Sequence, residues 1–128
     1  MSNNNRPLSP HLQIYKPQMT SVLSILHRIT GAGLGLGAMV VTVWLLAALA
    51  GEAAFAQVQA FRESLLGQFM LLGWLFAFVY HFLNGIRHLK WDFGYGIDMK
   101  SVYRSGWVVV FGAALLTVLI WVMMGHQS

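Results

Sequence analysis

The stretch SLLGQFMLLGWLFAFVYHFLNGI (Ser64–Ile86) contains no Asp, Glu, Lys or Arg, and the charged run RHLKWD (Arg87–Asp92) follows it at once. A helix needs about 20 consecutive apolar residues to cross the roughly 30 Å hydrocarbon core of a bilayer. Two more charge-free stretches, Ile29–Gly51 and Ser105–Ser128, lie on either side. None alternates with a period of two, as a barrel strand would. The sequence predicts an all-α integral membrane protein with three transmembrane helices. They are expected near residues 21–51, 64–90 and 105–125.

The composition supports the same fold class and excludes several functions. Of the 128 residues, 57% are hydrophobic and 9% are charged, whereas soluble domains carry about 25% charged residues. There is no cysteine, which excludes disulfides, thiolate nucleophiles and iron–sulfur ligation by this chain. The chain has no nucleotide-binding fingerprint and no nucleophile–base pair. We expect one membrane-anchor domain over residues 1–128, with no catalytic residue and no nucleic-acid partner.

The basic residues predict the orientation in the bilayer. Most lie before the first helix (Arg6, Lys16, Arg28) or between the second and third (Arg87, Lys90, Lys100, Arg104). The positive-inside rule therefore places the N-terminal segment, residues 1–19, and the second loop in the cytoplasm. The first loop, whose one basic residue is Arg62, then lies outside with the C-terminus. The opening segment resembles neither a signal peptide nor a transit peptide, which favours a bacterial inner membrane over a mitochondrial one.

His81 lies about six residues before Arg87, hence roughly 9 Å inside the charged edge of its helix. Ionisable groups inside a span usually face a bundle interior and mark function. His81 is either a neutral imidazole hydrogen-bonded to a neighbouring helix or an axial ligand of haem iron. His88 follows two turns later on the same face. A haem at His81 is expected to direct its propionates toward His88 and Arg87, although His88 can also be an interfacial histidine without a ligand.

The motif SILHRITG (Ser24–Gly31) begins the first helix. Arg28 in this motif can simply help to orient the helix in the membrane, with its charged end reaching the interface. Ser24 and Arg28 also share a face, since they are four residues apart, and together they suit a lipophilic ligand with carbonyl groups, such as a quinone. His27 lies about 100° round the helix from Arg28 and can face the haem. Because His81 is the only deeply placed histidine, the second haem ligand is expected from another chain.

The glycine run GAGLGLGAM, from Gly31 to Met39, contains two pairs of glycines spaced by four residues. Gly31 pairs with Gly35 and Gly33 with Gly37. Such pairs usually permit close packing of helices in a membrane. Room for a flat macrocycle against the backbone is the alternative.

Three motifs in this order carry a family resemblance: RPLSPHLQIYKP (Arg6–Pro17), SILHRITG (Ser24–Gly31) and HFLNGIRHLKWDFG (His81–Gly94). On these motifs the chain resembles, over nearly its whole length, the cytochrome b556 membrane-anchor family of succinate dehydrogenase, respiratory complex II. The resemblance implies a heterodimeric helix bundle around haem b, formed with a second anchor subunit that supplies the other haem ligand.

The resemblance also implies the roles of individual residues. His81 matches the axial haem ligand; His27, His88 and Arg28 match the haem propionate region; Ser24, Ile25 and Arg28 match ubiquinone contacts. It further implies an iron–sulfur subunit that passes electrons to ubiquinone and a flavoprotein subunit that oxidises succinate in the tricarboxylic acid cycle. Two alternatives remain, the anchor of a fumarate reductase and a structural anchor without a cofactor.

Overall fold

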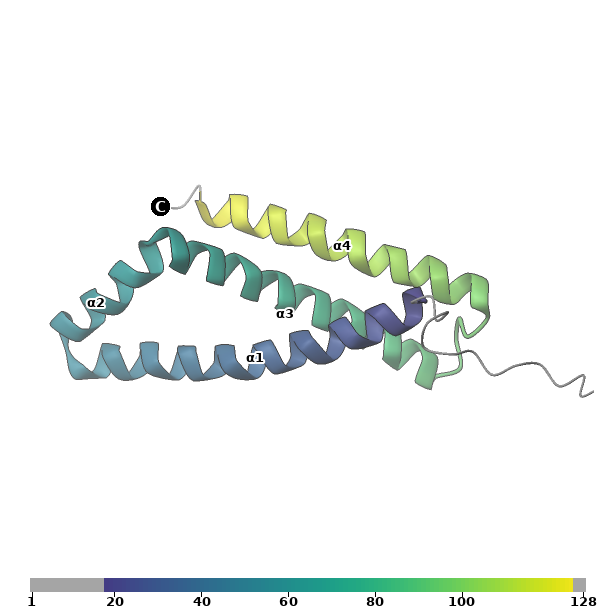
Figure 1. Ribbon diagram of the computed structural model, residues 1–128, viewed down its shortest axis with the longest axis horizontal. Coiled ribbons are helices and arrows are strands. Elements are labelled where there is room, and N and C mark those ends of the chain that lie inside the picture. The colour runs from purple at the N-terminus through teal and green to yellow at the C-terminus, as the bar shows by residue number, and fades with distance from the viewer. Residues whose placement is uncertain (1–17, 126–128) are drawn as a thin grey trace, which may run out of the picture.

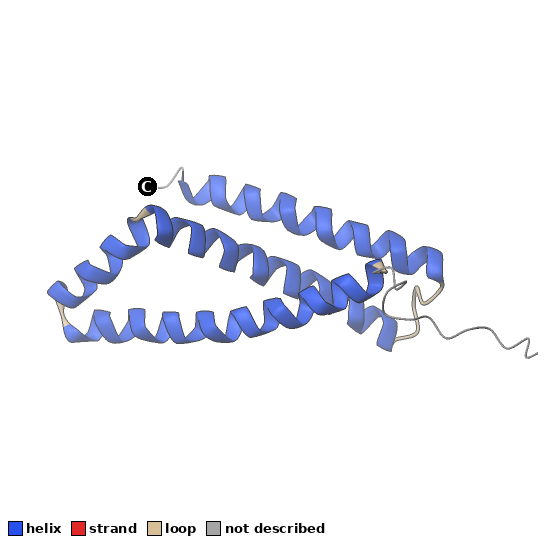
Figure 2. Cartoon of the chain, viewed as in Figure 1, coloured by secondary structure: helices blue, strands red, loops and turns tan. Residues whose placement is uncertain are grey.

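The structure, a computed structural model, describes residues 18–125, and all the regular elements among them are helices (Figure 2). These are α1 (Met19–Ala50), α2 (Glu52–Glu63), α3 (Leu65–Asp92) and α4 (Met99–Gly125). Helices α1, α3 and α4 are long and apolar enough to cross a membrane. The predicted all-α fold with three membrane-spanning helices is therefore confirmed. The first motif, Arg6–Pro17, and most of the expected cytoplasmic segment 1–19 lie outside the described residues.

The three long helices pack side by side, with α1 and α4 running in one direction and α3 in the other (Figure 1). The start of α1, the end of α3 and the start of α4 meet at one end of the molecule. From there α1 and α3 separate, and α2 bridges their far ends. This arrangement brings the two chemically distinctive motifs, Ser24–Gly31 and His81–Gly94, to the same end.

The sequence analysis assigned no helix to the first loop, and the structure corrects this with α2. Its apolar residues Phe55, Val58 and Phe61 recur every three positions, which places them on one side of a helix. The Trp44 ring lies 5.7 Å from that of Phe55, and its Nε1 donates to Oε1 of Gln59 at 3.3 Å. With 12 residues, α2 is too short to span a bilayer, which takes about 20, so it connects two spans.

Helix α4 begins at Met99, well before the predicted start near Ser105. The prediction used the absence of charge, which marks the hydrocarbon span and not the helix itself. Asp98 caps this helix, since its Oδ2 accepts a hydrogen bond from the Ser101 backbone N–H at 3.0 Å. Hydrogen bonds from the side chain and backbone of Ser101 hold the pKa of the Asp98 carboxyl below its ordinary value.

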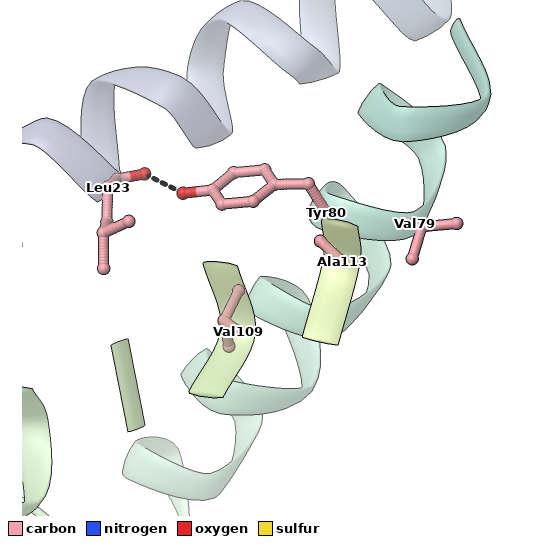
Figure 3. Close-up of a cluster of buried hydrophobic side chains, with 5 residues drawn as sticks. All are labelled: Leu23, Val79, Tyr80, Val109 and Ala113. Carbon is pink, nitrogen blue, oxygen red and sulfur yellow. Dashed lines mark hydrogen bonds between the residues drawn. The ribbon is translucent and has the colours of Figure 1, made fainter. Parts of the chain in front are cut away.

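A small core lies where the three long helices converge (Figure 3). It consists of Leu23 from α1, Val79 and Tyr80 from α3, and Val109 and Ala113 from α4. Within it, the Tyr80 hydroxyl donates to the Leu23 carbonyl oxygen at 2.8 Å. Many large apolar side chains elsewhere on the three spans are exposed. Lipid or other chains must cover them, because so extensive an apolar surface does not stay in water.

Candidate functional site

Helix α3 directs His81 toward the backbone of α1. Nδ1 of His81 lies 3.1 Å from the carbonyl oxygen of His27 and 3.2 Å from Oγ1 of Thr30. The Thr30 hydroxyl itself donates to the Leu26 carbonyl at 2.8 Å. If Nδ1 carried no proton, its lone pair would repel the lone pairs of the His27 carbonyl oxygen. We therefore place the proton on Nδ1, which then donates to that carbonyl. The lone pair of His81 is then on Nε2, which makes no hydrogen bond within residues 18–125.

The imidazole of His81 packs against two residues of α1, Gly31 and His27. A Cβ added to Gly31 would be 3.0 Å from Cε1 of His81, so the ring rests directly on this glycine. On its face the ring stacks against His27, with centroids 3.9 Å apart and planes 4° from parallel. The centroid of the His88 ring lies 5.2 Å from that of the His27 ring, and the two ring planes are tilted by 45°. Two helices therefore bring the three predicted histidines into one cluster.

One nitrogen of the histidine cluster is both buried and without a hydrogen-bond partner among residues 18–125. This atom is Nδ1 of His27. A buried polar atom of this kind costs about 1–3 kcal/mol unless another group binds it. Within residues 18–125, no three His, Asp or Glu side chains are arranged to hold a single metal ion together. The cluster offers a single lone pair at His81 and polar groups beside it, which suits a cofactor that takes one axial ligand from this chain.

Arg87 does not join this cluster, which corrects the expectation that it would face haem propionates with His88. It is only 5% exposed, and its guanidinium points at α4. There Nε donates to Oγ of Ser105 at 3.0 Å and Nη2 to the Val102 carbonyl at 2.9 Å, while Nη1 donates to Oδ1 of Asn84 on α3 at 3.3 Å. Consecutive helical residues differ by about 100°, so the Arg87 hydrogen bonds and the His88 ring are directed differently, although both side chains contact the Trp91 ring.

The other face of α1 carries the residues predicted to contact a quinone. Ser24, Ile25 and Arg28 line an open depression of about 350 Å³, together with Thr20 and Ser21. Arg28 and Ile25 are exposed and Ser24 is half-buried. Neither the Ser24 hydroxyl nor the Arg28 guanidinium has a hydrogen-bond partner among residues 18–125. This depression can supply two hydrogen-bond donors and an apolar contact to a ligand at the end of the span.

One glycine of each predicted pair in α1 makes room for a side chain of α3. Gly31 lies against His81, and a Cβ on Gly37 would overlap the indole of Trp74. Gly33 and Gly35 have nothing within 4 Å of an added Cβ. Gly33 lines a cavity between α1, α2 and α3, and Gly35 is exposed.

A larger cavity of about 510 Å³ lies between α1, α2 and α3. Its walls are mostly apolar, with Val40, Trp44, Phe61, Met70 and Trp74 among them. None of the predicted site residues lines this cavity. It is therefore separate from the histidine cluster and from the depression on α1.

Sequence reasoning missed the role of Thr30, although this residue is part of the motif SILHRITG. A threonine three residues after a histidine on one helix lies on the same side, so the spacing could have indicated a shared partner. Tyr80 was also missed. Its position next to His81 carries no such signal, because the acceptor on α1 is a backbone carbonyl that no sequence pattern identifies.

Comparisons with known proteins agree with the motifs. Residues 2–120 match the family described as succinate dehydrogenase/fumarate reductase transmembrane subunit. The chain is 47% identical over 119 residues to the succinate dehydrogenase cytochrome b556 subunit of Rickettsia conorii, with 93% of each chain covered. It is 40% identical over 119 residues to the protein of the same name in Paracoccus denitrificans, covering 93% of this chain and 92% of the other. The succinate dehydrogenase cytochrome b560 subunit of Marchantia polymorpha is 44% identical over 123 residues, with 90% and 88% covered.

Proposed function

The chain belongs to the succinate dehydrogenase/fumarate reductase transmembrane subunit family, and from this we propose that it anchors a succinate dehydrogenase in a bacterial inner membrane, binds haem b and helps to form a ubiquinone-reduction site. The names of the relatives favour succinate oxidation over fumarate reduction as the physiological direction. Succinate is oxidised on a flavoprotein subunit, and an iron–sulfur subunit delivers the electrons to the quinone. This chain is a non-catalytic membrane subunit of that complex.

His81 is the residue that would hold haem b. Its Nδ1 proton is fixed by the His27 carbonyl and Thr30, which leaves the Nε2 lone pair for the iron, and such outer hydrogen bonds orient a ligand and raise its basicity. When bound, haem b supplies a one-electron carrier. His27 and His88 would donate hydrogen bonds or positive charge to its propionates, whereas Arg28, the third residue expected in that region, lines the depression on the other face of α1. His27 has a buried nitrogen that lacks a partner, which favours this role.

The second axial ligand comes from a second anchor subunit in this proposal. A haem held by His81 and a second imidazole would need that second imidazole to come from the side away from His81. His27 stacks on His81 with nearly parallel rings, so both imidazoles lie on the same side of any group bound to His81. His27 is therefore unsuited to be the opposing ligand. We therefore keep the heterodimeric bundle around the haem, which the family resemblance implies, as part of the proposal.

For the quinone, the Ser24 hydroxyl and the Arg28 guanidinium would each donate to a ring oxygen, and Ile25 would contact the ring. The positive charge of Arg28 stabilises negative charge as it develops during reduction. The depression is open, so the remaining walls come from the iron–sulfur subunit and the second anchor. One observation carries this proposal: α1 sorts neighbouring residues onto two faces, with His27 against His81 and Ser24, Ile25 and Arg28 in one depression.

The test of the quinone site is Arg28→Ala and Ser24→Ala in the assembled complex. A hydrogen bond to or from a charged group contributes about 1.5–3 kcal/mol, so Arg28→Ala should lower kcat/KM for ubiquinone about 10- to 100-fold. Ser24→Ala should lower it less. Reduction of a water-soluble dye that takes electrons from the other subunits should not change.

Arg104→Ala is the matched control, because Arg104 is an exposed arginine at the same end of the bundle on α4. Its kcat/KM for ubiquinone should equal that of the wild type. If Arg28→Ala and Ser24→Ala both retain wild-type quinone reductase activity, quinone does not bind at this depression.

A further inference from the structure

Two consecutive residues of α3 bind carbonyl oxygens one turn apart on α1. The Tyr80 hydroxyl donates to the Leu23 carbonyl at 2.8 Å, and Nδ1–H of His81 donates to the His27 carbonyl at 3.1 Å. Figure 3 shows the first of these bonds crossing from α3 to α1. Tyr80 is 1% exposed, so no solvent competes for its hydroxyl. The two bonds fix both the height and the rotation of α1 relative to α3.

Helix α4 holds the same turn of α1 from a second side. A Cβ on Gly106 would lie 2.8 Å from Cδ1 of Leu23 and 2.8 Å from Cε of Met19. These side chains can approach α4 only because residue 106 has none. The first turns of α1 are therefore held by a hydrogen bond from α3 and by close packing on α4.

This held segment also carries the proposed quinone residues. Ser24 follows Leu23 directly, and Ile25 and Arg28 lie within the next turn and a half. They line the depression on the outer side of α1, while Leu23 is 3% exposed on the inner side. Any rotation or shift of α1 at Leu23 moves the Ser24 hydroxyl and the Arg28 guanidinium with it.

We propose that Tyr80 is a positioning residue that sets the ubiquinone-contacting face of α1 through the Leu23 carbonyl, and that Gly106 of α4 supports the same face by accommodating the Leu23 side chain. This inference rests on the proposed quinone site. Tyr80 touches neither cofactor nor substrate in this account. Tyr80 acts by holding α1 in position. Because His81 is the next residue, the same turn of α3 positions both the proposed haem ligand and the quinone-contacting face of α1.

Tyr80→Phe tests the inference in the assembled complex, since it removes the hydroxyl and keeps the buried ring. Loss of one positioning hydrogen bond should raise KM for ubiquinone about three- to tenfold. The reduced-minus-oxidised haem spectrum and the dye reductase activity should stay as in the wild type. A purely structural role for Tyr80 would instead lower the melting temperature and leave KM for ubiquinone unchanged, and that result would overturn the inference.

Gly106→Ala gives a second, independent variant, and Gly112→Ala is its control on the same helix. The added methyl at 106 would lie 2.8 Å from Cδ1 of Leu23 and Cε of Met19, so the ends of these two side chains must shift, whereas at 112 it would make an ordinary contact of 3.6 Å with Leu83. KM for ubiquinone should rise for Gly106→Ala and stay unchanged for Gly112→Ala. An equal KM in both variants contradicts the inference.

Arg28→Ala distinguishes a failure of the proposed quinone site from a failure of the proposed positioning role of Tyr80. If Arg28→Ala raises KM for ubiquinone while Tyr80→Phe and Gly106→Ala do not, the quinone site stands and the positioning role of Tyr80 is wrong. If Arg28→Ala has no effect either, the proposed quinone site fails and this inference fails with it.

Discussion

At the scale of single residues, the tautomer of His81 decides which of its ring nitrogens can bind a metal. The His27 carbonyl and Thr30 keep the proton of His81 on Nδ1. The spacing in the sequence predicted that His81 and His88 share a face of one helix and that His27 of another helix can face a haem, since helical periodicity fixes faces. It did not identify the carbonyl acceptor, because backbone groups leave no mark in the sequence. The expectation that Arg87 faces haem propionates beside His88 was wrong. The two residues are adjacent in sequence but about 100° apart round the helix, and Arg87 forms hydrogen bonds with α4 instead.

Gly31→Ala should weaken haem binding without removing the ligand. The added Cβ would lie 3.0 Å from Cε1 of His81, so the imidazole must move by a few tenths of an ångström. Overpacking of this kind costs about 1–3 kcal/mol, which corresponds to a loss of about tenfold or more in haem affinity. Titration of haem into the haem-depleted complex, followed by absorbance, measures the change.

Gly33→Ala is the matched control for that substitution. It lies on the same helix and has nothing within 4 Å of an added Cβ, so haem affinity should be unchanged. If Gly31→Ala also binds haem with wild-type affinity, the position of the His81 ring against α1 does not matter for ligation.

At the scale of elements, the sequence predicted the three spans and missed what lies between them. Absence of charge over about 20 residues is a strong signal, because the bilayer penalises charge. Helix α2 gives no such signal, since it is short and its apolar side is narrow. The start of α4 was placed too late because Lys100 and Arg104 are helical residues outside the hydrocarbon core. The cap formed by Asp98 and Ser101 marks that start better than charge does.

The packing of α1 on α3 predicts different effects for two glycines. A Cβ on Gly37 would overlap the Trp74 indole, whereas one on Gly35 has nothing within 4 Å. Gly37→Ala should therefore destabilise the full chain in detergent by about 1–3 kcal/mol. Gly35→Ala should be neutral or slightly stabilising, because alanine favours a helix over glycine by about 1 kcal/mol. Equal melting temperatures for the two variants would mean that Trp74 does not pack on α1 at this position.

At the scale of the whole molecule, one end of the bundle gathers the charge and the chemistry. The histidine cluster, the depression on α1 and the basic residues Arg28, Arg87 and Lys100 all belong to the end where α1, α3 and α4 converge (Figure 1). The positive-inside rule predicts that this end lies at the cytoplasmic surface, where soluble subunits would dock. The cavity between α1, α2 and α3 was not predictable, because it depends on how the Trp74 indole packs against Gly37.

The most direct test of the central claim, that His81 ligates haem b in a complex with a second anchor subunit, is the reduced-minus-oxidised absorption spectrum of the purified complex. The wild type should show a cytochrome b band. His81→Ala should abolish or shift it while the subunits still co-purify, and His88→Ala should keep it. An unaltered band in His81→Ala, or no band in the wild type, would contradict the account and leave a structural anchor without a cofactor.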